Sequence, residues 1–543
     1  MLKLTNALMM TTVFVVLVLC AFPIIAVAVA ALGAPTDGLS NLIQTVLPRY
    51  MWNTFGLVIV TGLSTLLIGL STAWLVTMTE FPGRRILEVL LVLPFAFPAY
   101  VMAYAYTHIL DHPGIVQSSL RDLFGWGPRD YWFPEIRSFG GAAAMLSLVL
   151  YPYVYLLARA AFLSQSGAQF IAARTLGHGP WNTFVTVSLP MARAAAFGGV
   201  LLVAMETIAD FGTVSFFGVQ TFATGIYQSW FAMADRAAAA QLALGLLSFA
   251  LLLALLERVT RRTSVTTHGR RQEDMPRFEL QGAKGFAATL ICFLPVLLGA
   301  IIPTIALITM AIGSEQDLFG QRYLGFITNS LTLALMGAVL TVLAAMAVGS
   351  ARRIFPSIMT RTALQAARLG YAVPGGVIAV GLLVPLAAFD NWLSDKAETL
   401  FGVSTGLLIT GSVALLLVAY VVRFLAAAIS AYESGASAMN PNLDNAARIL
   451  GASPMRTAMR IHSPLLTPSL LTAALIVFVD VMKELPATLI LRPFNFDTLA
   501  VQAFRLASDE RLAGAAVPSL VIAGIGLVPT ILLCLRIRRR SGE

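Results

Sequence analysis

Long apolar stretches alternate with short polar segments along almost the whole chain. A helix that crosses the hydrocarbon core of a bilayer needs about 20 mainly apolar residues, and twelve stretches reach that length. Their approximate bounds are 8–33, 54–78, 88–110, 140–162, 192–213, 237–257, 286–313, 329–350, 367–388, 404–428, 467–488 and 513–535. The short alternating segments typical of a membrane β-barrel are negligible. The pattern predicts an all-α polytopic membrane protein with about 12 transmembrane helices.

Composition agrees with this class, because 58% of the 543 residues are hydrophobic and only 12% are charged. Soluble domains average about a quarter charged residues. The net charge of +9 could indicate a nucleic-acid partner, but the Arg and Lys residues gather in alternate loops, as the positive-inside rule requires. We therefore expect a lipid bilayer and no nucleic acid, with both termini in the cytoplasm. The first stretch is read as a retained helix, and the three cysteines predict neither a disulfide framework nor a metal site.

The chain contains two copies of one design. Residues 171–190 align without gaps to 445–464, at an offset of 445 − 171 = 274, and eight positions are identical. The identical pairs are Ala172/Ala446, Ala173/Ala447, Arg174/Arg448, Leu176/Leu450, Gly177/Gly451, Pro180/Pro454, Thr183/Thr457 and Pro190/Pro464. Asn53 and Pro98 recur at nearly the same spacing as Asn329 and Pro374. Six spans in each half predict two parallel repeats, residues 1–257 and 286–543, joined by a cytoplasmic linker at 258–285.

Each copy of the aligned segment reads as a joint of two short helices. Asn440-Pro441 is typical of a helix start, Gly451 of a helix end, and Ser453-Pro454 of a second start. Gly177 and Gly179-Pro180 punctuate the first copy in the same way, and a proline, Pro190 or Pro464, is expected to interrupt each joint before the next span. Ala172, Ala173 and Leu176 would give the first joint a small-residue face for a partner. An ordinary amphipathic loop helix is the alternative for either copy alone.

These segments resemble the cytoplasmic loop of binding-protein-dependent ABC importer permeases, which carries a Glu-Ala-Ala, Gly and Leu-Pro pattern. The chain reads Ile171-Ala172-Ala173…Gly177…Leu189-Pro190 and Asn445-Ala446-Ala447…Gly451…Ser463-Pro464, so both copies lack the Glu and the second lacks the Leu. In that family the loop docks on a separate ATPase subunit. The resemblance implies a bacterial inner-membrane protein with two ATPase subunits and a periplasmic binding protein as partners, and these docking residues: Ala172, Ala173, Leu176, Gly177, Pro190, Ala446, Ala447, Leu450, Gly451 and Pro464.

Three further segments, 206–218, 480–493 and 504–516, look like those of fused ferric-iron permeases. Thiamine permeases share the fused layout, so thiamine or another small solute stays an alternative cargo. A secondary transporter with two six-helix halves is a less favoured alternative, suggested only by "TEFPGRR" at 79–85. No phosphate-binding G-x-x-x-x-G-K-[ST] loop occurs, and no catalytic constellation is visible, so we expect neither an enzyme nor a cofactor.

Charged residues lie inside two of the expected spans. Glu206 and Asp210 are four apart, which predicts that they share one helix face. Asp480 and Glu484 occupy the same positions at the offset of 274, with Lys483 beside them. Ionisable groups in a membrane normally face a cavity or a partner, so these five residues are candidates for lining a translocation pathway. Closed ion pairs with each other, or bonds to backbone, are the alternative. Arg423, near the end of another span, is expected to extend to the membrane surface. No permanent metal site is expected.

Overall fold

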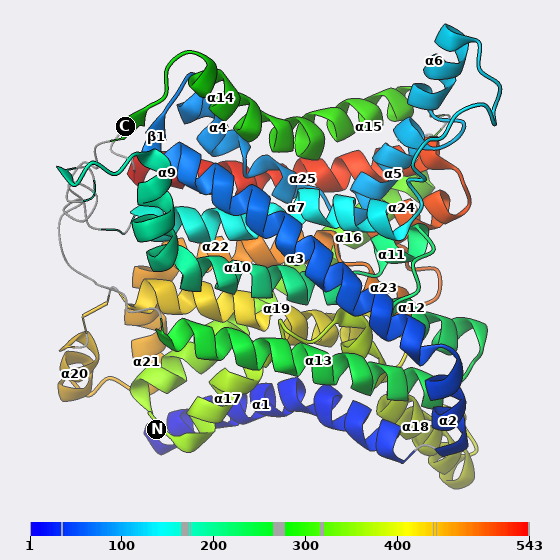
Figure 1. The fold of residues 1–543 in the computed structure, drawn as a ribbon. Helices are drawn as coiled ribbons and strands as arrows, with labels where there is room; N and C mark the ends of the chain where they lie inside the picture. Colours follow the sequence, from blue (N-terminus) through cyan, green and yellow to red (C-terminus); the bar gives the residue numbers. More distant parts are fainter. Residues whose placement is uncertain are drawn as a thin grey trace. The chain divides into compact units, whose positions relative to one another are not determined.

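The structure, a computed structural model, describes residues 2–33, 36–163, 165, 173, 175–263, 277–314, 316, 320–437, 439, 440 and 442–540. Ala172, Pro441 and residues 264–276 of the predicted linker therefore lie outside the described residues. The chain forms two compact units that are each discontinuous in sequence. Unit 1 contains residues 1–48, 222–251 and 317–502, and unit 2 contains 49–221, 252–316 and 503–543. The predicted all-α architecture is confirmed (Figure 1).

Unit 1 is built from helices of both sequence repeats. In chain order they are α1 (Leu2–Leu32), α2 (Thr36–Thr45), α12 (Phe222–Tyr227), the π-helix η3 (Gln228–Ala232), most of α13 (Arg236–Thr263), α16 (Gln321–Ile354), α17 (Ile358–Leu369), α18 (Gly375–Phe401), α19 (Val413–Ala436), α20 (Asn442–Ile449), α21 (Pro454–Thr457), the π-helix η5 (Ala458–His462), α22 (Ser463–Met482), α23 (Pro486–Leu491) and the start of α24 (Leu499–Ser508).

Unit 2 is composed in the same way. Its elements are α3 (Leu47–Met78), β1 (Thr79–Glu80), α4 (Arg84–Leu90), the 3-10 helix η1 (Leu93–Ala96), α5 (Ala99–Leu110), α6 (Ile115–Phe124), α7 (Phe139–Leu163), α9 (Pro180–Thr183), the π-helix η2 (Phe184–Ser188), α10 (Leu189–Ala209), α11 (Gly212–Phe216), β2 (Phe278–Glu279), α14 (Ala283–Val296), the π-helix η4 (Leu297–Ile301), α15 (Ile302–Ile312) and α25 (Leu512–Arg540).

Eleven helices in the described residues are long and apolar enough to cross a membrane, or twelve if one bent pair counts as a single span. That pair joins Arg84–Ala96 to Ala99–Phe124 with a bend of 95°. The expectation of one helix across 88–110 is therefore wrong. Phe97 is extended, at φ −91° and ψ 130°, because the ring of Pro98 disfavours helical backbone in the residue before it.

The repeat predicted from sequence reappears in the helix bounds. α7, α10 and α3 begin 274 residues before α19, α22 and α16 respectively. In unit 2, α7 packs against α10, and Gly199 brings these two helices together, since a Cβ there would lie 2.8 Å from the Cα of Val154. Small residues that let backbones approach are typical of helix packing in membranes. In unit 1, α19 packs against both α16 and α22.

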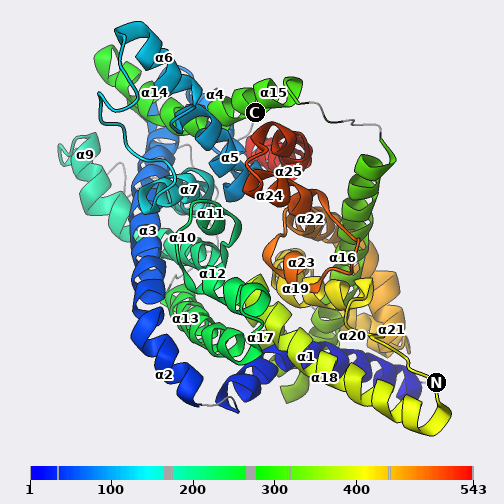
Figure 2. The same ribbon diagram turned by 90° about the vertical axis from the view of Figure 1, so that its right-hand side faces the viewer.

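The first helix of each repeat packs on helices of the other repeat. α1 lies against α16, α17 and α18 of the second repeat, as Figures 1 and 2 show. α15, near the start of the second repeat, lies against α5 of the first. Gly381 permits the α1 contact, because a Cβ at this position would collide with the backbone of Pro23. The spatial units and the sequence repeats are therefore different divisions of the chain.

Candidate functional site: two joints and the charged ends of two spans

The two aligned segments form nearly identical joints, which we name the first joint (171–190) and the second joint (445–464). Gly177 and Gly451 have left-handed backbone, at φ +83° and +73°. The N–H of His178 donates to the carbonyl of Ala173 at 3.0 Å, and the N–H of Ala452 donates to that of Ala447 at 3.0 Å. This bond across the glycine is the Schellman helix end. The predicted stop at each glycine is confirmed.

A second short helix begins directly after each stop. In the second joint, Ser453 accepts a hydrogen bond from the N–H of Arg456 at 3.3 Å and Pro454 occupies the first turn. In the first joint, the N–H of Thr183 donates to the carbonyl of Gly179 at 2.9 Å, and Thr457 does the same to Ser453. The predicted restart is therefore confirmed in both copies.

The expected interruption at Pro190 and Pro464 is wrong. A π turn precedes each proline, and the helix then continues without a break, so that Trp181–Ala209 and Pro454–Met482 are each one candidate span. The N–H of Leu189 donates to the carbonyl of Phe184, five residues back. Proline cannot donate to the carbonyl four residues before it. The wider π turn absorbs this loss, as π turns inside α-helices do.

Among the described residues, the joints expose those predicted for docking, except two alanines. Leu176 and Leu450 are 76% and 85% exposed, whereas Ala173 and Ala447 are buried. The alanine face expected to meet a partner therefore packs inward at these two positions, where the alanine carbonyls also accept the bonds that close the turns. Gly177, Gly451, Pro190, Pro464 and Ala446 are exposed, and Ala172 lies outside the described residues.

The charged ends of α10 and α22 cap the short helices that follow them. Asp210 accepts hydrogen bonds from the N–H groups of Thr213 and Val214, both at 3.1 Å, at the start of α11. Glu484 accepts from the N–H groups of Ala487 and Thr488, both at 3.0 Å, in α23. These are the same positions at the offset of 274. The two acids do not share a helix face with Glu206 and Asp480, because each lies beyond the end of its span.

The remaining predicted pathway residues differ between the repeats. Lys483 forms an ion pair with Asp480, with Nζ 2.9 Å from Oδ1. Of the ion pairs considered for Lys483, the structure therefore shows the one with Asp480. Glu484 forms its ion pair with Arg423 instead. Glu206 lies half-buried in the last turn of α10. At the offset of 274, Lys483 corresponds to Ala209, so the first repeat has no cation at that position.

Arg423 is a residue whose role the sequence interpretation missed. It lies with its guanidinium 3.6 Å from the carboxylate of Glu484, whose side chain is 1% exposed. Extension to the membrane surface is therefore wrong, because the buried carboxylate attracts the guanidinium inward. A side chain at Gly375 would collide with Arg423 and come within 2.7 Å of Glu484. The repeat could have indicated this pairing, because the residue that matches Arg423 in the first repeat is the apolar Val149. A charge at a position that is apolar in the other repeat needs a partner.

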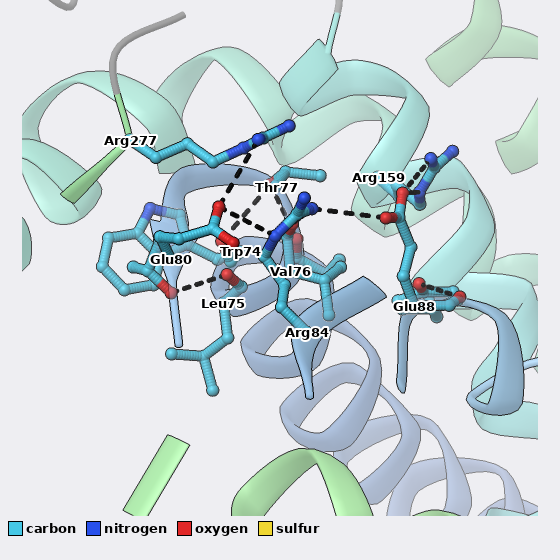
Figure 3. A network of polar contacts seen from close by, with 12 residues as sticks. Trp74, Leu75, Val76, Thr77, Glu80, Arg84, Glu88, Arg159 and Arg277 are labelled. Carbon is cyan, nitrogen blue, oxygen red and sulfur yellow. Dashed lines mark hydrogen bonds and ion pairs between the residues drawn. The ribbon is translucent and has the colours of Figure 1, made fainter. Parts of the chain in front are cut away.

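Figure 3 shows a polar network around Arg84, at the turn between α3 and α4. Arg84 is buried and lies 3.0 Å from Glu80 and 3.3 Å from Glu88. Glu88 also accepts from Nε of Arg159 on α7 at 3.0 Å. Arg277, within the predicted linker, reaches Glu80 at 3.5 Å, and β2 pairs in parallel with β1. The "TEFPGRR" segment therefore fixes α3, α4, α7 and β2 together.

Among the described residues, no group of three or more His, Cys, Asp and Glu side chains is arranged to hold a metal ion. The two joints and the capped span ends recur in both repeats. The span ends carry carboxylates that cap short helices, and each joint carries one exposed leucine.

Comparison with known proteins decides the class of this molecule. Residues 77–264 and 355–540 each match the family described as "Binding-protein-dependent transport system inner membrane component". The chain belongs to this family. The double match confirms the resemblance and the fused two-repeat organisation of the permease, and it favours an ABC importer permease over the secondary-transporter alternative.

Several relatives of the permease have names that specify a cargo. The Fe(3+)-transport system permease protein FbpB 2 of Haemophilus influenzae is 23% identical over 503 residues, covering 92% of both chains. The ferric transport system permease protein FbpB of Actinobacillus pleuropneumoniae is 25% identical over 87% of this chain and 68% of its own length. The sulfate transport system permease protein CysW of Escherichia coli is 30% identical, but only over 33% of this chain.

Proposed function

We propose that this permease moves ferric iron, delivered by a periplasmic binding protein, through the bacterial inner membrane. The observation that carries the proposal is the similarity to a named Fe(3+)-transport permease over 92% of both chains. Matches to a sulfate permease cover a third of this chain, and the charged ends of α10 and α22 are rich in carboxylates. Carboxylate oxygens suit a hard cation such as Fe³⁺ and repel an oxyanion.

Two separate ATPase subunits supply the energy, one at each joint. The support is the shared geometry of the joints, in which a left-handed glycine turns the chain and an exposed leucine precedes it. Leu176, Gly177, Leu450 and Gly451 form the docking surface, while Ala173 and Ala447 hold the turn from within. With ATPase subunits at the joints, the joints and both termini lie in the cytoplasm, as the positions of the arginine-rich loops favour.

The charged span ends mark the translocation pathway, with distinct roles for the five residues. Glu206 and Asp480 face the passing ion, and Lys483 balances the charge of Asp480. Asp210 and Glu484 hold α11 and α23 in place beside it. Ionisable groups in spans are costly and are retained where they serve such roles.

Uptake of radiolabelled iron tests the cargo. A strain that lacks the gene is complemented with the wild-type gene, and uptake of ferric iron is compared with uptake of thiamine and of sulfate. We expect complementation to restore iron uptake alone. Restored thiamine or sulfate uptake without iron uptake would refute the iron assignment and leave the permease assignment intact.

A further inference from the structure

A buried network links the second joint to three long helices. Asp444 lies on α20, and both of its carboxylate oxygens are engaged. Oδ2 accepts from Nε of Arg353, at the end of α16, and Oδ1 lies 2.7 Å from Nε2 of His462, in the π turn before α22. His462 is fully buried. One carboxylate on α20, directly before the second joint, thus contacts two spans.

The network continues on both sides of Asp444. Arg353 also donates to the carbonyl of Ala436 at 3.0 Å, at the end of α19, and to that of Met439 at 3.3 Å, between α19 and α20. Nδ1 of His462 lies 3.2 Å from Oγ of Ser350, which lies 3.1 Å from the hydroxyl of Tyr432 on α19. The contacts therefore tie α20 to α16, α19 and α22, and the burial protects them from water, which would weaken them.

The first joint cannot form this network, because its matching positions hold other residues. At the offset of 274, the counterparts of Arg353, Ser350, Tyr432, Asp444 and His462 are as follows: Thr79, Val76, Ala158, Phe170 and Ser188. The main ionic network at the corresponding end of the first repeat is that of Arg84, which reaches α7 through Glu88 and β2 through Glu80 and Arg277 (Figure 3).

We infer that Asp444 is a positioning residue that transmits displacement of the second joint into α22, through His462, and that the two joints are consequently not equivalent. The inference rests on the proposed docking of ATPase subunits at the joints. From His462 to Asp480 the helix rises about 27 Å. Because this helix is continuous, a shift at the π turn also displaces Asp480 at its other end. The first joint has no carboxylate at the matching position, so we expect its displacement by the ATPase to move α10 less directly.

The test uses the complete complex of permease, ATPase subunits and binding protein in liposomes. The variants are Asp444→Asn, which removes the charge, and His462→Ser, which installs the residue found in the first joint. Three quantities are measured: co-purification of ATPase subunits, ATP hydrolysis stimulated by the binding protein, and iron taken up per ATP hydrolysed. We expect normal co-purification, hydrolysis within about twofold of wild type, and a roughly tenfold loss of uptake per ATP, a factor equal to about 1.4 kcal/mol of coupling.

Asp444→Glu restores the carboxylate and should recover part of the uptake per ATP, which a purely structural role would not predict. Arg368→Gln is the matched control, because it removes another ion pair of unit 1, to Glu433, that does not involve the joint. Unchanged uptake per ATP in both variants, or loss of the ATPase subunits from the complex, would overturn the inference. If wild-type permease itself bound no ATPase, the proposed docking would fail instead. His462→Ser carries the test if Asp444→Asn does not accumulate.

Discussion

Asp210 and Glu484, 274 positions apart, cap helices in the same way, since each accepts hydrogen bonds from the N–H groups of the third and fourth residues after it. The caps differ in their surroundings, because Glu484 also lies beside the buried guanidinium of Arg423. The two repeats therefore share a backbone device and place it in different electrostatic settings. This difference determines how much each acid contributes to stability.

Replacement of the two caps should have unequal effects. Asp210→Asn keeps a side-chain oxygen that can cap α11, so we expect a loss of about 1 kcal/mol or less. Glu484→Gln leaves the charge of Arg423 buried without its partner, which costs about 3–5 kcal/mol. Thermal unfolding in detergent measures both. The double variant Glu484→Gln with Arg423→Gln should recover part of the loss, and equal effects of the two single variants would contradict the assignment.

The network in Figure 3 provides a second contrast, between buried and exposed ion pairs. Glu88→Gln removes the carboxylate that Arg84 and Arg159 share in a mostly buried site, and we expect a loss of about 3–5 kcal/mol. Arg277→Ala removes a pair in which both side chains are over a third exposed, so the loss should be about 0–1 kcal/mol. Comparison of unfolding temperatures decides the point, and a larger effect of Arg277→Ala would show that β2 depends on this pair.

The left-handed glycines of the joints should be sensitive to any side chain. Nothing lies within 4 Å of a Cβ added at Gly177 or Gly451, so the cost of Gly→Ala is the backbone strain of about 1–2 kcal/mol. Gly→Leu adds bulk on the proposed docking surface. We expect insertion to be retained and iron uptake to become uncoupled from ATP hydrolysis in Gly451→Leu and Gly177→Leu. Wild-type uptake in both leucine variants would contradict the docking assignment.

Glu206→Gln tests the pathway without disturbing a cap, because Asp210 is the residue that caps α11. We expect uptake to slow about tenfold, equivalent to about 1.4 kcal/mol in the rate-limiting barrier, while ATPase subunits still co-purify. Asp480→Asn is the matched variant in the second repeat. Its effect should be smaller, since Lys483 already balances this carboxylate. Unchanged uptake in Glu206→Gln would remove its pathway role.

An ion cluster at the start of α7 predicts a pH dependence. The hydrogen bond from Arg137, at 2.5 Å, lowers the pKa of Glu510 below its ordinary value, burial opposes this effect, and the charge of Arg137 adds to it. Because the folded-state pKa is lowered, the stabilising contribution is complete above the unfolded value of about 4.3 and is lost as pH falls through the folded value. The stability difference between wild type and Glu510→Gln should therefore shrink in acid, as unfolding temperatures measured at several pH values would show. A difference that does not change with pH would contradict the ion pair.

The sequence was sufficient where a local rule decides the structure. Gly177, Gly451 and Ser453 stop and restart helices through their own backbone and side-chain bonds, so their positions could be predicted. Pro190 and Pro464 could not, because the choice between a break and a π turn depends on packing around the helix. The burial of Ala173 and Ala447 and the pairing of Arg423 with Glu484 also depend on distant segments, which periodicity alone does not bring together.

The π turns before Pro190 and Pro464 change which face of the helix each later residue of the span occupies. Each π turn holds one more residue than an α turn, and one residue corresponds to a rotation of about 100°. A helical wheel drawn from the joint would therefore assign Glu206 and Asp480 to the wrong face by more than a quarter of a circle. Scanning mutagenesis or cross-linking along α10 and α22 should be phased separately on the two sides of the proline, with the charged ends counted from the caps.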